Sequence, residues 1–364
     1  MDITIGGKWK KNNMETETKK TTGFIGGKFL PLHLGHVYAI MSASTQVDEL
    51  YVICSTSEER DREICKRDGI KYIPPEQRLS WLGELLSDLE NIKILHLQDF
   101  YGITDYNWEK GRDDVRKMIG KPIDFIFSSE YSYKEIFESL YPEAKHVIID
   151  AKRTNVPISA TDLRKDLFSH WDKLPNCVRS YFTKRVAIVG TESCGKSTLA
   201  KKLAKMYNTE YVEEVGRNYC INHSDKLTVQ MFDSIAMDHF LLQEKKARQS
   251  SRVLFIDSDA VVTQFYLDMY FPGKKSPMIE EIVKLQQYDL VLYLEPDVKW
   301  VDDGLRVTGE DNIRKQNNER LKQMYRDKGI EFVSISGDYN QRFTSAKNLI
   351  DKLFKGSEAY LAGR

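Results

Sequence analysis

Short apolar runs alternate with amphipathic segments along the first half of the chain. The runs are rich in β-branched and aromatic residues, which is typical of strands buried inside a sheet. The segments between them carry apolar residues at helical spacing. The predicted strands span residues 23–27, 50–54, 92–97, 125–128 and 146–149, and the predicted helices span 37–46 and 75–89. Strands that alternate with helices predict parallel βαβ units.

A second series of the same kind follows. A helix is expected to begin near Ser159 and run toward Phe168, and strands are expected at residues 185–189, 252–257 and 290–294. We therefore predict an α/β protein of two domains, each with a parallel sheet. The expected boundaries are a flexible lead-in at 1–21, a first domain at 22–170, a linker at 171–184 and a second domain at 185–364.

Composition and charge narrow the class of protein. The chain has 54 Lys and Arg against 54 Asp and Glu, and this balance argues against a nucleic-acid coat protein, which needs a basic excess. Its five cysteines form no Cys-x-x-Cys pair, so neither a disulfide framework nor a structural zinc site is expected. With no signal-peptide core and no apolar stretch of bilayer length, we expect a soluble cytoplasmic protein without membrane partners.

The second half contains a phosphate-binding loop motif. The segment GTESCGKS fits G-x-x-x-x-G-K-[ST], follows the apolar strand RVAIV and opens a helix. Backbone N–H groups of such a loop wrap a β-phosphate, and the helix N-terminus adds positive potential. We expect Lys196 to reach the β- and γ-phosphate oxygens and Ser197 to offer its hydroxyl to Mg²⁺. The expected ATP contacts are Gly190, Ser193, Cys194, Gly195, Lys196, Ser197 and Thr198.

The segment VLFIDSD, residues 253–259, supports this interpretation. Four apolar residues end in an acidic residue at the edge of a strand, and Asp257 is expected to hold Mg²⁺. Asp259 has two readings that the sequence leaves open: it positions or deprotonates a substrate hydroxyl, or it caps the next helix.

Three acidic residues and one arginine complete the expected kinase site. In VDDGLR, residues 301–306, Arg306 can close over transferring phosphates, and Asp302 and Asp303 can take ribose hydroxyls. Glu213 follows the second strand of this domain and is the acidic contact expected on the substrate side, where its neighbours Glu214 and Arg217 are also expected.

A histidine motif in the first half indicates a second reaction. In GGKFLPLHLGH, His33 and His36 are three residues apart at a helix start, so both imidazoles lie on one face. They can donate hydrogen bonds to a triphosphate during displacement at its α-phosphorus. We expect Lys28 to act with them, and Gly26, Phe29 and Gly35 to contact ATP.

The segment ISATDLR, residues 158–164, is the expected complement. Ser159 and Thr161 are good helix caps, and the helix start exposes N–H groups and hydroxyls to an anion. Arg164 is expected to bind the leaving pyrophosphate. No covalent nucleophile is needed, because in-line attack is aided by position and charge.

Taken together, these motifs resemble the bifunctional nicotinamide-mononucleotide adenylyltransferase/ribosylnicotinamide kinase (NadR-like) family, from about residue 22 onward. Ala160 stands where the commoner form of the motif has a second serine. The resemblance implies a Rossmann-like nucleotidylyltransferase domain followed by a P-loop kinase domain, with Mg²⁺ and ATP. It also implies phosphorylation of nicotinamide riboside and adenylyl transfer to nicotinamide mononucleotide, which gives NAD. Trp108 and Arg153 become candidates to contact the mononucleotide.

Two other functions stay open on the sequence alone. One is a phosphopantetheine adenylyltransferase/dephospho-coenzyme A kinase, and the other is a non-catalytic regulator that binds ATP and NAD. The expected partners are small molecules, without nucleic acid, and a homo-oligomer is left open. For the kinase domain, Tyr266, Phe265 and Trp300 are candidates to stack on nicotinamide, with core packing the stronger reading for each.

Overall fold

The computed structural model describes residues 20–99, 107–222, 227–297 and 311–354. The elements up to residue 148 are β1 (Thr22–Gly27), α1 (Leu34–Ser44), β2 (Glu49–Thr56), α2 (Glu58–Arg67), α3 (Pro75–Leu86), β3 (Ile92–Gln98), α4 (Trp108–Ile119), β4 (Phe125–Ser128), the 3-10 turn η1 (Tyr131–Tyr133), α5 (Lys134–Leu140) and β5 (Lys145–Ile148). The remaining elements are α6 (Ala160–Lys165), the 3-10 turn η2 (Trp171–Lys173), α7 (Asn176–Phe182), β6 (Lys184–Val189), α8 (Lys196–Met206), β7 (Tyr211–Val212), α9 (Val215–Asn222), α10 (Val229–Gln249), β8 (Val253–Asp257), α11 (Ala260–Tyr270), α12 (Pro277–Leu285), β9 (Leu290–Leu294), α13 (Asp311–Asp327), β10 (Val333–Ile335) and α14 (Tyr339–Lys352).

The chain divides into two compact units. The first unit comprises Met1–Leu30, Gly35–Ile64 and Tyr72–Pro157, and the second comprises Pro31–Leu34, Cys65–Lys71 and Ile158–Arg364.

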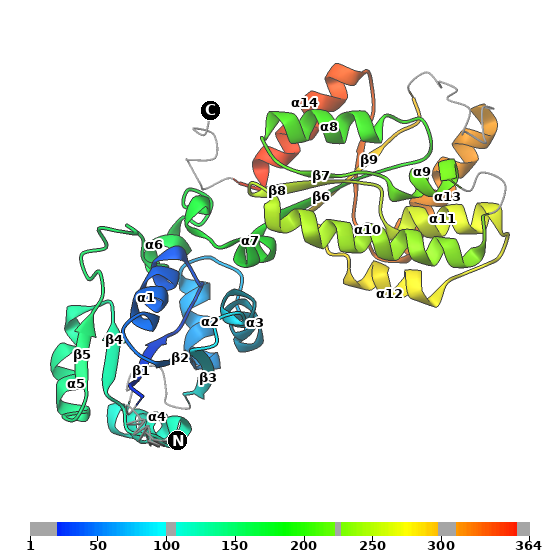
Figure 1. Cartoon of the computed structure of the whole chain (residues 1–364). Coiled ribbons are helices and arrows are strands. Elements are labelled where there is room, and N and C mark those ends of the chain that lie inside the picture. Colours follow the sequence, from blue (N-terminus) through cyan, green and yellow to red (C-terminus); the bar gives the residue numbers. More distant parts are fainter. Residues whose placement is uncertain (1–19, 100–106, 223–226, 298–310, 355–364) are drawn as a thin grey trace, which may run out of the picture. The chain divides into compact units, whose positions relative to one another are not determined.

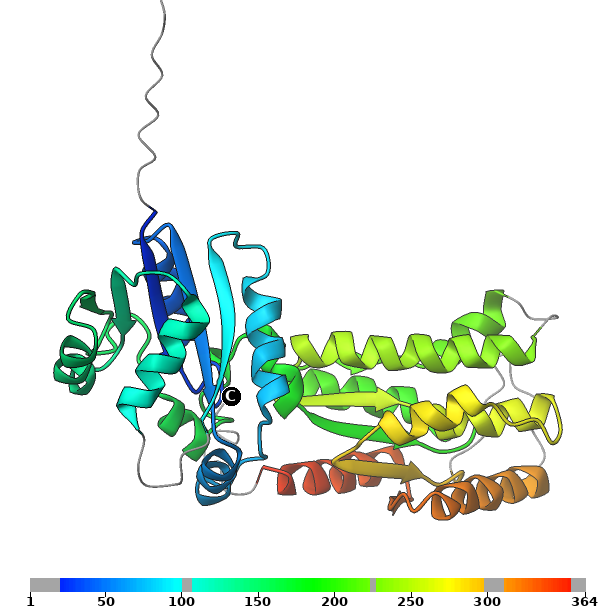
Figure 2. The same cartoon turned by 90° about the horizontal axis from the view of Figure 1, so that it is seen from below.

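The sheet of the first unit has the strand order β3-β2-β1-β4-β5 over the described residues, and every pair is parallel (Figure 1, Figure 2). The helices α4 and α5 cover one face, where Val115 and Tyr141 pack on Phe24 and Ile126. Since parallel crossovers are right-handed, α1 and α3 cover the other face. β2 and β3 lie on one side of β1, whereas β4 and β5 lie on the other, so the strand order reverses at β1. Ligands of such sheets bind at the carboxyl end of the strands where the order reverses, which here is the loop after β1.

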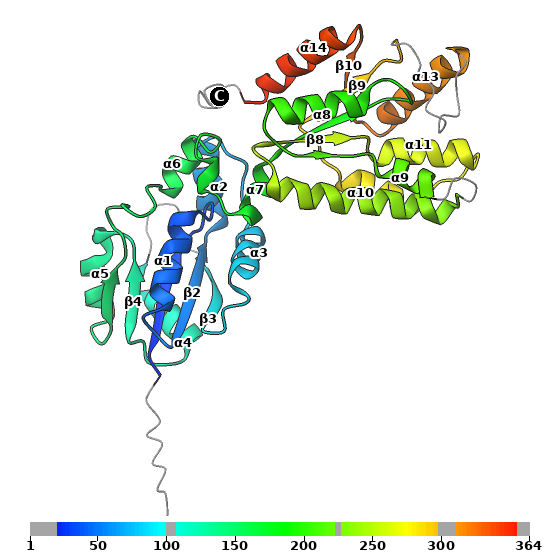
Figure 3. The same cartoon turned by 45° about the horizontal axis from the view of Figure 1, so that its top comes forward.

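The sheet of the second unit has the order β10-β9-β6-β8-β7 over the described residues and is also parallel. The helices α8 and α14 pack on one face, and α10 and α11 pack on the other (Figure 3). Leu321 and Tyr325 of α13 join the core that α11 forms with the sheet. Here β6 lies between β8 and β9, so the loop after β6 is the equivalent ligand position. The prediction of two parallel-sheet α/β domains is confirmed.

Helix ends differ from the predictions in three places. The first helix was expected at 37–46 but begins at Leu34, so Gly35 and His36 lie inside its first turn. The predicted helix 75–89 ends at Leu86. The helix after Ser159 ends at Lys165 rather than near Phe168, because the next residue, Asp166, leaves helical geometry.

The segment predicted as a linker, residues 171–184, is folded. It forms η2 and α7, where Cys177 and Val178 are buried. The indole N–H of Trp171 donates to the backbone carbonyl of Ser250 at 3.1 Å. The hydroxyl of Thr183 donates to the backbone carbonyl of Ala247, also at 3.1 Å. The segment is therefore part of the second unit's packing. The predicted lead-in lies almost entirely outside the described residues.

Candidate active sites

The phosphate-binding loop joins β6 to α8 in the second unit. Gly190 has φ 140°, and a Cβ added to it would lie 2.7 Å from the carbonyl oxygen of Leu294. Gly195 has φ 90° and directly precedes the first helical residue, Lys196. Glycine alone adopts both conformations without strain. The sequence therefore folds this segment into a loop whose backbone wraps around the position of an anion.

Lys196 is buried at the centre of this loop. Its ammonium donates to the carbonyl of Thr191 at 2.9 Å. Burial disfavours its charge, but the groups around it, including Glu214 and Asp257, outweigh that effect and hold the pKa of Lys196 above its usual value. Lys196 is therefore a fixed positive charge.

Asp257 ends β8 beside the loop and is buried. Burial, followed by the negative charge of Glu214, raises the pKa of its carboxyl to about 6, although Lys196 and the hydroxyl of Ser197 oppose the shift. Within the described residues, its Oδ1 is buried and meets no hydrogen-bond donor. Such a carboxylate beside a serine hydroxyl and a phosphate loop fits a hard cation such as Mg²⁺.

Of the two roles that the sequence left open for Asp259, the structure shows the helix cap, and the role toward a substrate hydroxyl stays a prediction. Oδ1 of Asp259 accepts the N–H of Val262 at 3.0 Å, which caps α11, and also the hydroxyl of Tyr325 at 2.8 Å. The same side chain lines the cavity beside the phosphate loop. Burial raises the pKa of Asp259 to about 6.

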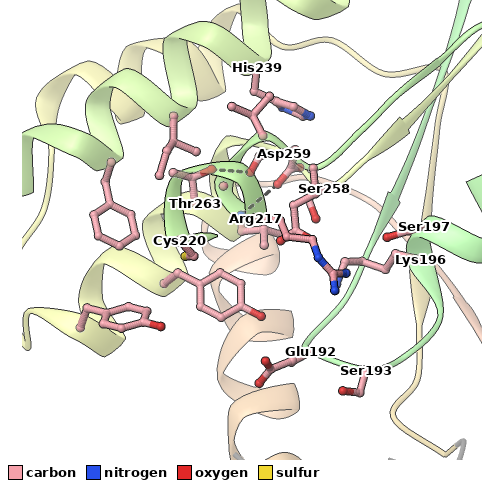
Figure 4. A pocket seen from close by; sticks show the side chains of 18 of the residues that line it. Glu192, Ser193, Lys196, Ser197, Arg217, Cys220, His239, Ser258, Asp259 and Thr263 are labelled. Atoms are coloured by element: carbon pink, nitrogen blue, oxygen red, sulfur yellow. Dashed lines mark hydrogen bonds between the residues drawn. The ribbon is translucent and has the colours of Figure 1, made fainter. Parts of the chain in front are cut away.

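A cavity of about 260 Å³ opens next to the phosphate loop (Figure 4). Lys196, Ser197, Ser258 and Asp259 lie along its polar side (Figure 4). Its apolar and aromatic side is formed by Phe232, Ile235, Val262, Tyr266 and Tyr270. A pocket of mixed polar and aromatic lining is typical of a site for a small organic substrate.

Two adjacent glutamates take different positions at this cavity. Glu213 is exposed, and its carboxylate lies 3.8 Å from the ammonium of Lys246. Glu214 lines the cavity. The contact predicted for Glu213 stays a prediction, and Glu214 is the acidic residue of this pair that lies at the cavity.

The other predicted kinase residues divide into three groups. Cys194 is buried, with its thiol on the carbonyl of Thr191 at 3.0 Å, and Ser193 and Thr198 line the cavity. Phe265 is in the core and packs edge-on against Tyr266, which reaches the cavity. Asp302, Asp303, Arg306 and Trp300 lie outside the described residues.

In the first unit, a tight turn connects β1 to α1. Phe29 has φ 48° and is buried, and its ring packs edge-on against that of His36 at 5.1 Å. His33 is buried and directly precedes α1, and it belongs to the short segment Pro31–Leu34 that is assigned to the second unit. A Cβ added to Gly26 would meet no atom within 4 Å among the described residues, so the backbone is open there.

Lys28 of the same turn is held by a carboxylate that the sequence analysis missed. Its ammonium lies 2.8 Å from Oδ1 of Asp61 on α2, and Oδ2 of Asp61 lies 2.8 Å from Arg78 on α3. No local signal marks these residues, because they are 33 and 50 positions away from Lys28.

The predicted anion-binding residues of α6 belong to the second unit. Ser159 caps the helix by accepting the N–H of Asp162 at 3.0 Å. Arg164 is buried; it donates to Asp68 at 2.7 Å and to the hydroxyl of Thr161 at 3.2 Å. Hydrogen bonds from Arg67 and Arg164 outweigh burial and lower the pKa of Asp68 to about 2.

The two candidate contacts for a mononucleotide lie in the first unit. The ring of Trp108 packs at 5.7 Å from that of Tyr133 and at 6.0 Å from that of Phe137. Arg153 has φ 52°, and its guanidinium lies 3.4 Å from the carboxylate of Glu130. Its loop is ordered by Asp150, whose carboxylate accepts the backbone N–H groups of residues 154–156.

One arginine outside the motifs supports the phosphate loop. Arg342 of α14 is buried and donates to the carbonyls of Cys194 at 2.6 Å, Glu295 at 2.7 Å and Gly337 at 2.7 Å. It ties the loop to the end of β9 and to the turn before α14. The sequence gives no sign of this role, because the carbonyls of Cys194 and Glu295 lie 148 and 47 residues away from Arg342.

The fold and these sites define a two-domain enzyme of nucleotide chemistry, with one phosphate-binding motif after the central strand of each sheet. The comparison with protein families matches residues 185–342 to a model described as an AAA domain. The proteins named trifunctional NAD biosynthesis/regulator protein NadR from Escherichia coli K12 and Salmonella typhimurium LT2 are 35% and 33% identical over 347 residues. Both alignments cover 92% of this chain and 84% of the relative. The chain belongs to the NadR family.

Two solved structures have the same fold. A NadR protein in complex with NR has a TM-score of 0.75 at 24% identity, and one in complex with NAD and AMP-PNP has 0.74 at 23%. Both superpositions cover 92% of this chain and 96% of the other. None of the helices in the described part of the chain combines the length and the apolar character needed to cross a membrane.

Proposed function

We infer that this chain is a bifunctional enzyme of NAD biosynthesis. In the first step, ATP phosphorylates nicotinamide riboside to nicotinamide mononucleotide. In the second step, the adenylyl group of another ATP is transferred to the mononucleotide, which gives NAD and pyrophosphate. The observation that supports this inference best is that two different phosphate-binding motifs each follow the central strand of their own parallel sheet. Membership of the NadR family supports the same two activities.

The kinase step is assigned to the cavity of the second unit. The 5′-hydroxyl of the riboside attacks the γ-phosphorus of ATP, and ADP leaves. We propose that Lys196 balances the charge that builds up on the β- and γ-phosphate oxygens. Asp259 is proposed to accept the hydroxyl proton, and its pKa of about 6 suits a base that works near neutral pH.

The residues around Asp257 fit Mg²⁺. Asp257 and Ser197 would hold the ion together with phosphate oxygens, as is usual for Mg²⁺ in nucleotide sites. When bound, the ion neutralises charge on the β- and γ-phosphates. The chain supplies the buried carboxylate of Asp257, whose Oδ1 accepts no hydrogen bond from the described residues.

The lining of the cavity suits nicotinamide riboside. Its nicotinamide ring is a planar cation, and aromatic faces together with a carboxylate attract such a group. Phe232, Tyr266 and Tyr270 supply the aromatic faces, and Glu214 supplies the negative charge.

Adenylyl transfer is assigned to the histidine motif. The phosphate of the mononucleotide attacks the α-phosphorus of ATP directly, and pyrophosphate leaves. His33, His36 and Lys28 are proposed to stabilise charge on the triphosphate. Ser159, Thr161 and Arg164 are proposed to bind phosphate oxygens, and Trp108 and Arg153 are proposed to contact the mononucleotide.

An assay with product identification tests the two activities. We expect the chain, incubated with ATP, Mg²⁺ and nicotinamide riboside, to form the mononucleotide and then NAD, both identified by mass. A parallel incubation with 4′-phosphopantetheine should give no dephospho-coenzyme A. Formation of the coenzyme A product without NAD would overturn the assignment.

A further inference from the structure

A buried cluster of three charged residues lies behind the turn that carries the histidine motif. It consists of Lys28, Asp61 and Arg78, all within the first unit. The side chains of Asp61 and Arg78 are 0% exposed, whereas that of Lys28 is 31% exposed. The cluster therefore reaches the surface only through Lys28.

Hydrogen bonds fix each member of this cluster. Asp61 accepts the ammonium of Lys28 at 2.8 Å through Oδ1, and it accepts Arg78 at 2.8 Å and the N–H of Ser57 at 3.1 Å through Oδ2. Arg78 also donates to the backbone carbonyl of Lys28 at 3.0 Å. Two elements, α2 and α3, thus hold both ends of the same lysine.

The charges of the cluster leave a surplus. Two cations surround one carboxylate, and the carboxylate is shared between them. A lysine paired with an aspartate alone would form a neutral pair and attract an anion less. The neighbouring Asp99, which is buried, and Arg60 add one charge of each sign. Because Arg78 supplies the second positive charge of the cluster, the net charge is about +1, and the exposed lysine presents it.

We propose that Asp61 and Arg78 are positioning residues for Lys28 in adenylyl transfer. Asp61 fixes the ammonium against the end of the turn, and Arg78 balances Asp61 so that Lys28 still attracts the triphosphate. This inference rests on the proposed role of the histidine motif and extends it to residues outside both motifs.

The test compares Asp61→Asn in two backgrounds. In the wild-type background, we expect kcat/KM for ATP in NAD formation from the mononucleotide to fall about tenfold or more, because the ammonium loses its fixed position. In a Lys28→Ala background, the same change should alter kcat/KM by no more than about twofold, because Asp61 then has no lysine to position. Equal losses in both backgrounds, or no loss in the wild type, would overturn the proposal.

Glu49→Gln is the matched control. Glu49 also lies between two lysines, Lys93 and Lys121, but at the opposite end of β2. We expect this variant to keep NAD formation within about twofold of the wild type.

Asp61→Ser, which is smaller, repeats the test if asparagine is not accommodated. If circular dichroism shows that neither variant folds, Asp61 has a structural role and the proposal fails. Absence of NAD formation by the wild type would instead refute the proposed function.

Discussion

Two buried carboxyl groups give the kinase site its expected pH dependence at the scale of single residues. Burial raises the pKa of Asp257 and of Asp259 from 3.8 to about 6. Both must be ionised, one to hold a cation and the other to accept a proton. The proposed mechanism therefore becomes inactive when either group is protonated.

We expect riboside phosphorylation to decline below pH 6, the approximate pKa of both carboxyls, and to approach about a 100-fold loss per pH unit because both groups must be ionised. The effect on stability has the opposite direction. Between the unfolded pKa of 3.8 and the folded pKa of about 6, the folded state binds more protons, so the free energy of unfolding decreases as pH rises through this window. Initial rates and urea unfolding from pH 4.5 to pH 7.5 measure both effects.

Asp259→Asn provides the control for the stability effect. Asparagine still accepts the N–H of Val262 but cannot ionise. As pH rises, the free energy of unfolding of the variant should therefore decrease less than that of the wild type. A phosphorylation rate that stays constant down to pH 5 would contradict the assigned roles, and so would an identical pH dependence of stability in both proteins.

Side-chain partners far away in the sequence explain which residues could not be predicted. The glycines and Lys196 of the phosphate loop were predictable, because their roles are set by the local backbone. Arg78 and Arg342 were not, since Asp61 lies 17 residues from Arg78 and Cys194 lies 148 residues from Arg342. The choice between Glu213 and Glu214 depended on where β7 ends, and such boundaries carry little sequence signal.

At the scale of elements, α14 links the C-terminal part of the chain to the phosphate loop. Asp338 caps this helix by accepting the N–H groups of Asn340 and Gln341, and the side chain of Gln341 accepts the N–H of Asp338 in return. Arg342 follows in the same turn and holds the carbonyl of Cys194. The cap therefore fixes the start of the helix that supports the loop.

Asp338→Ala should lower the free energy of unfolding by about 1 kcal/mol, because two N–H groups lose their acceptor. It should also raise KM for ATP in the kinase reaction, since Arg342 becomes less fixed. Asp338→Asn is the matched control, because asparagine caps helices about as well as aspartate. Urea unfolding and kinase assays of both variants measure the effects. If alanine and asparagine gave the same result, the cap would have no such role.

Most strands were predictable, and helix ends were less so. Strands of a parallel sheet are buried on both faces and read as apolar runs, as in LYVIC and LVLYL. β10 was missed because it is short and two of its three residues, Val333 and Ser334, are exposed. That residues 171–184 are folded could not be predicted, because the segment is polar and contains a proline. Nothing in it indicates that Trp171 is buried and donates to the carbonyl of Ser250, the residue that follows α10.

At the scale of the whole molecule, one chain contains two sheets of the same kind with different chemistry after their central strands. The histidine motif follows β1, and the phosphate loop follows β6. In each motif a glycine-containing turn leads into the start of a helix, and we propose that both bind phosphate there. The product of the kinase reaction is the acceptor for the adenylyl transfer, so a single chain can carry out both steps.

The central claim is that the two reactions use separate ATP sites. Steady-state rates of both reactions for Lys196→Ala and His36→Ala test it most directly. We predict that Lys196→Ala lowers riboside phosphorylation by about 100-fold or more and leaves NAD formation from supplied mononucleotide unchanged. His36→Ala should do the reverse. If either variant, shown to be folded by circular dichroism, lost both activities, the assignment of two separate sites would be contradicted.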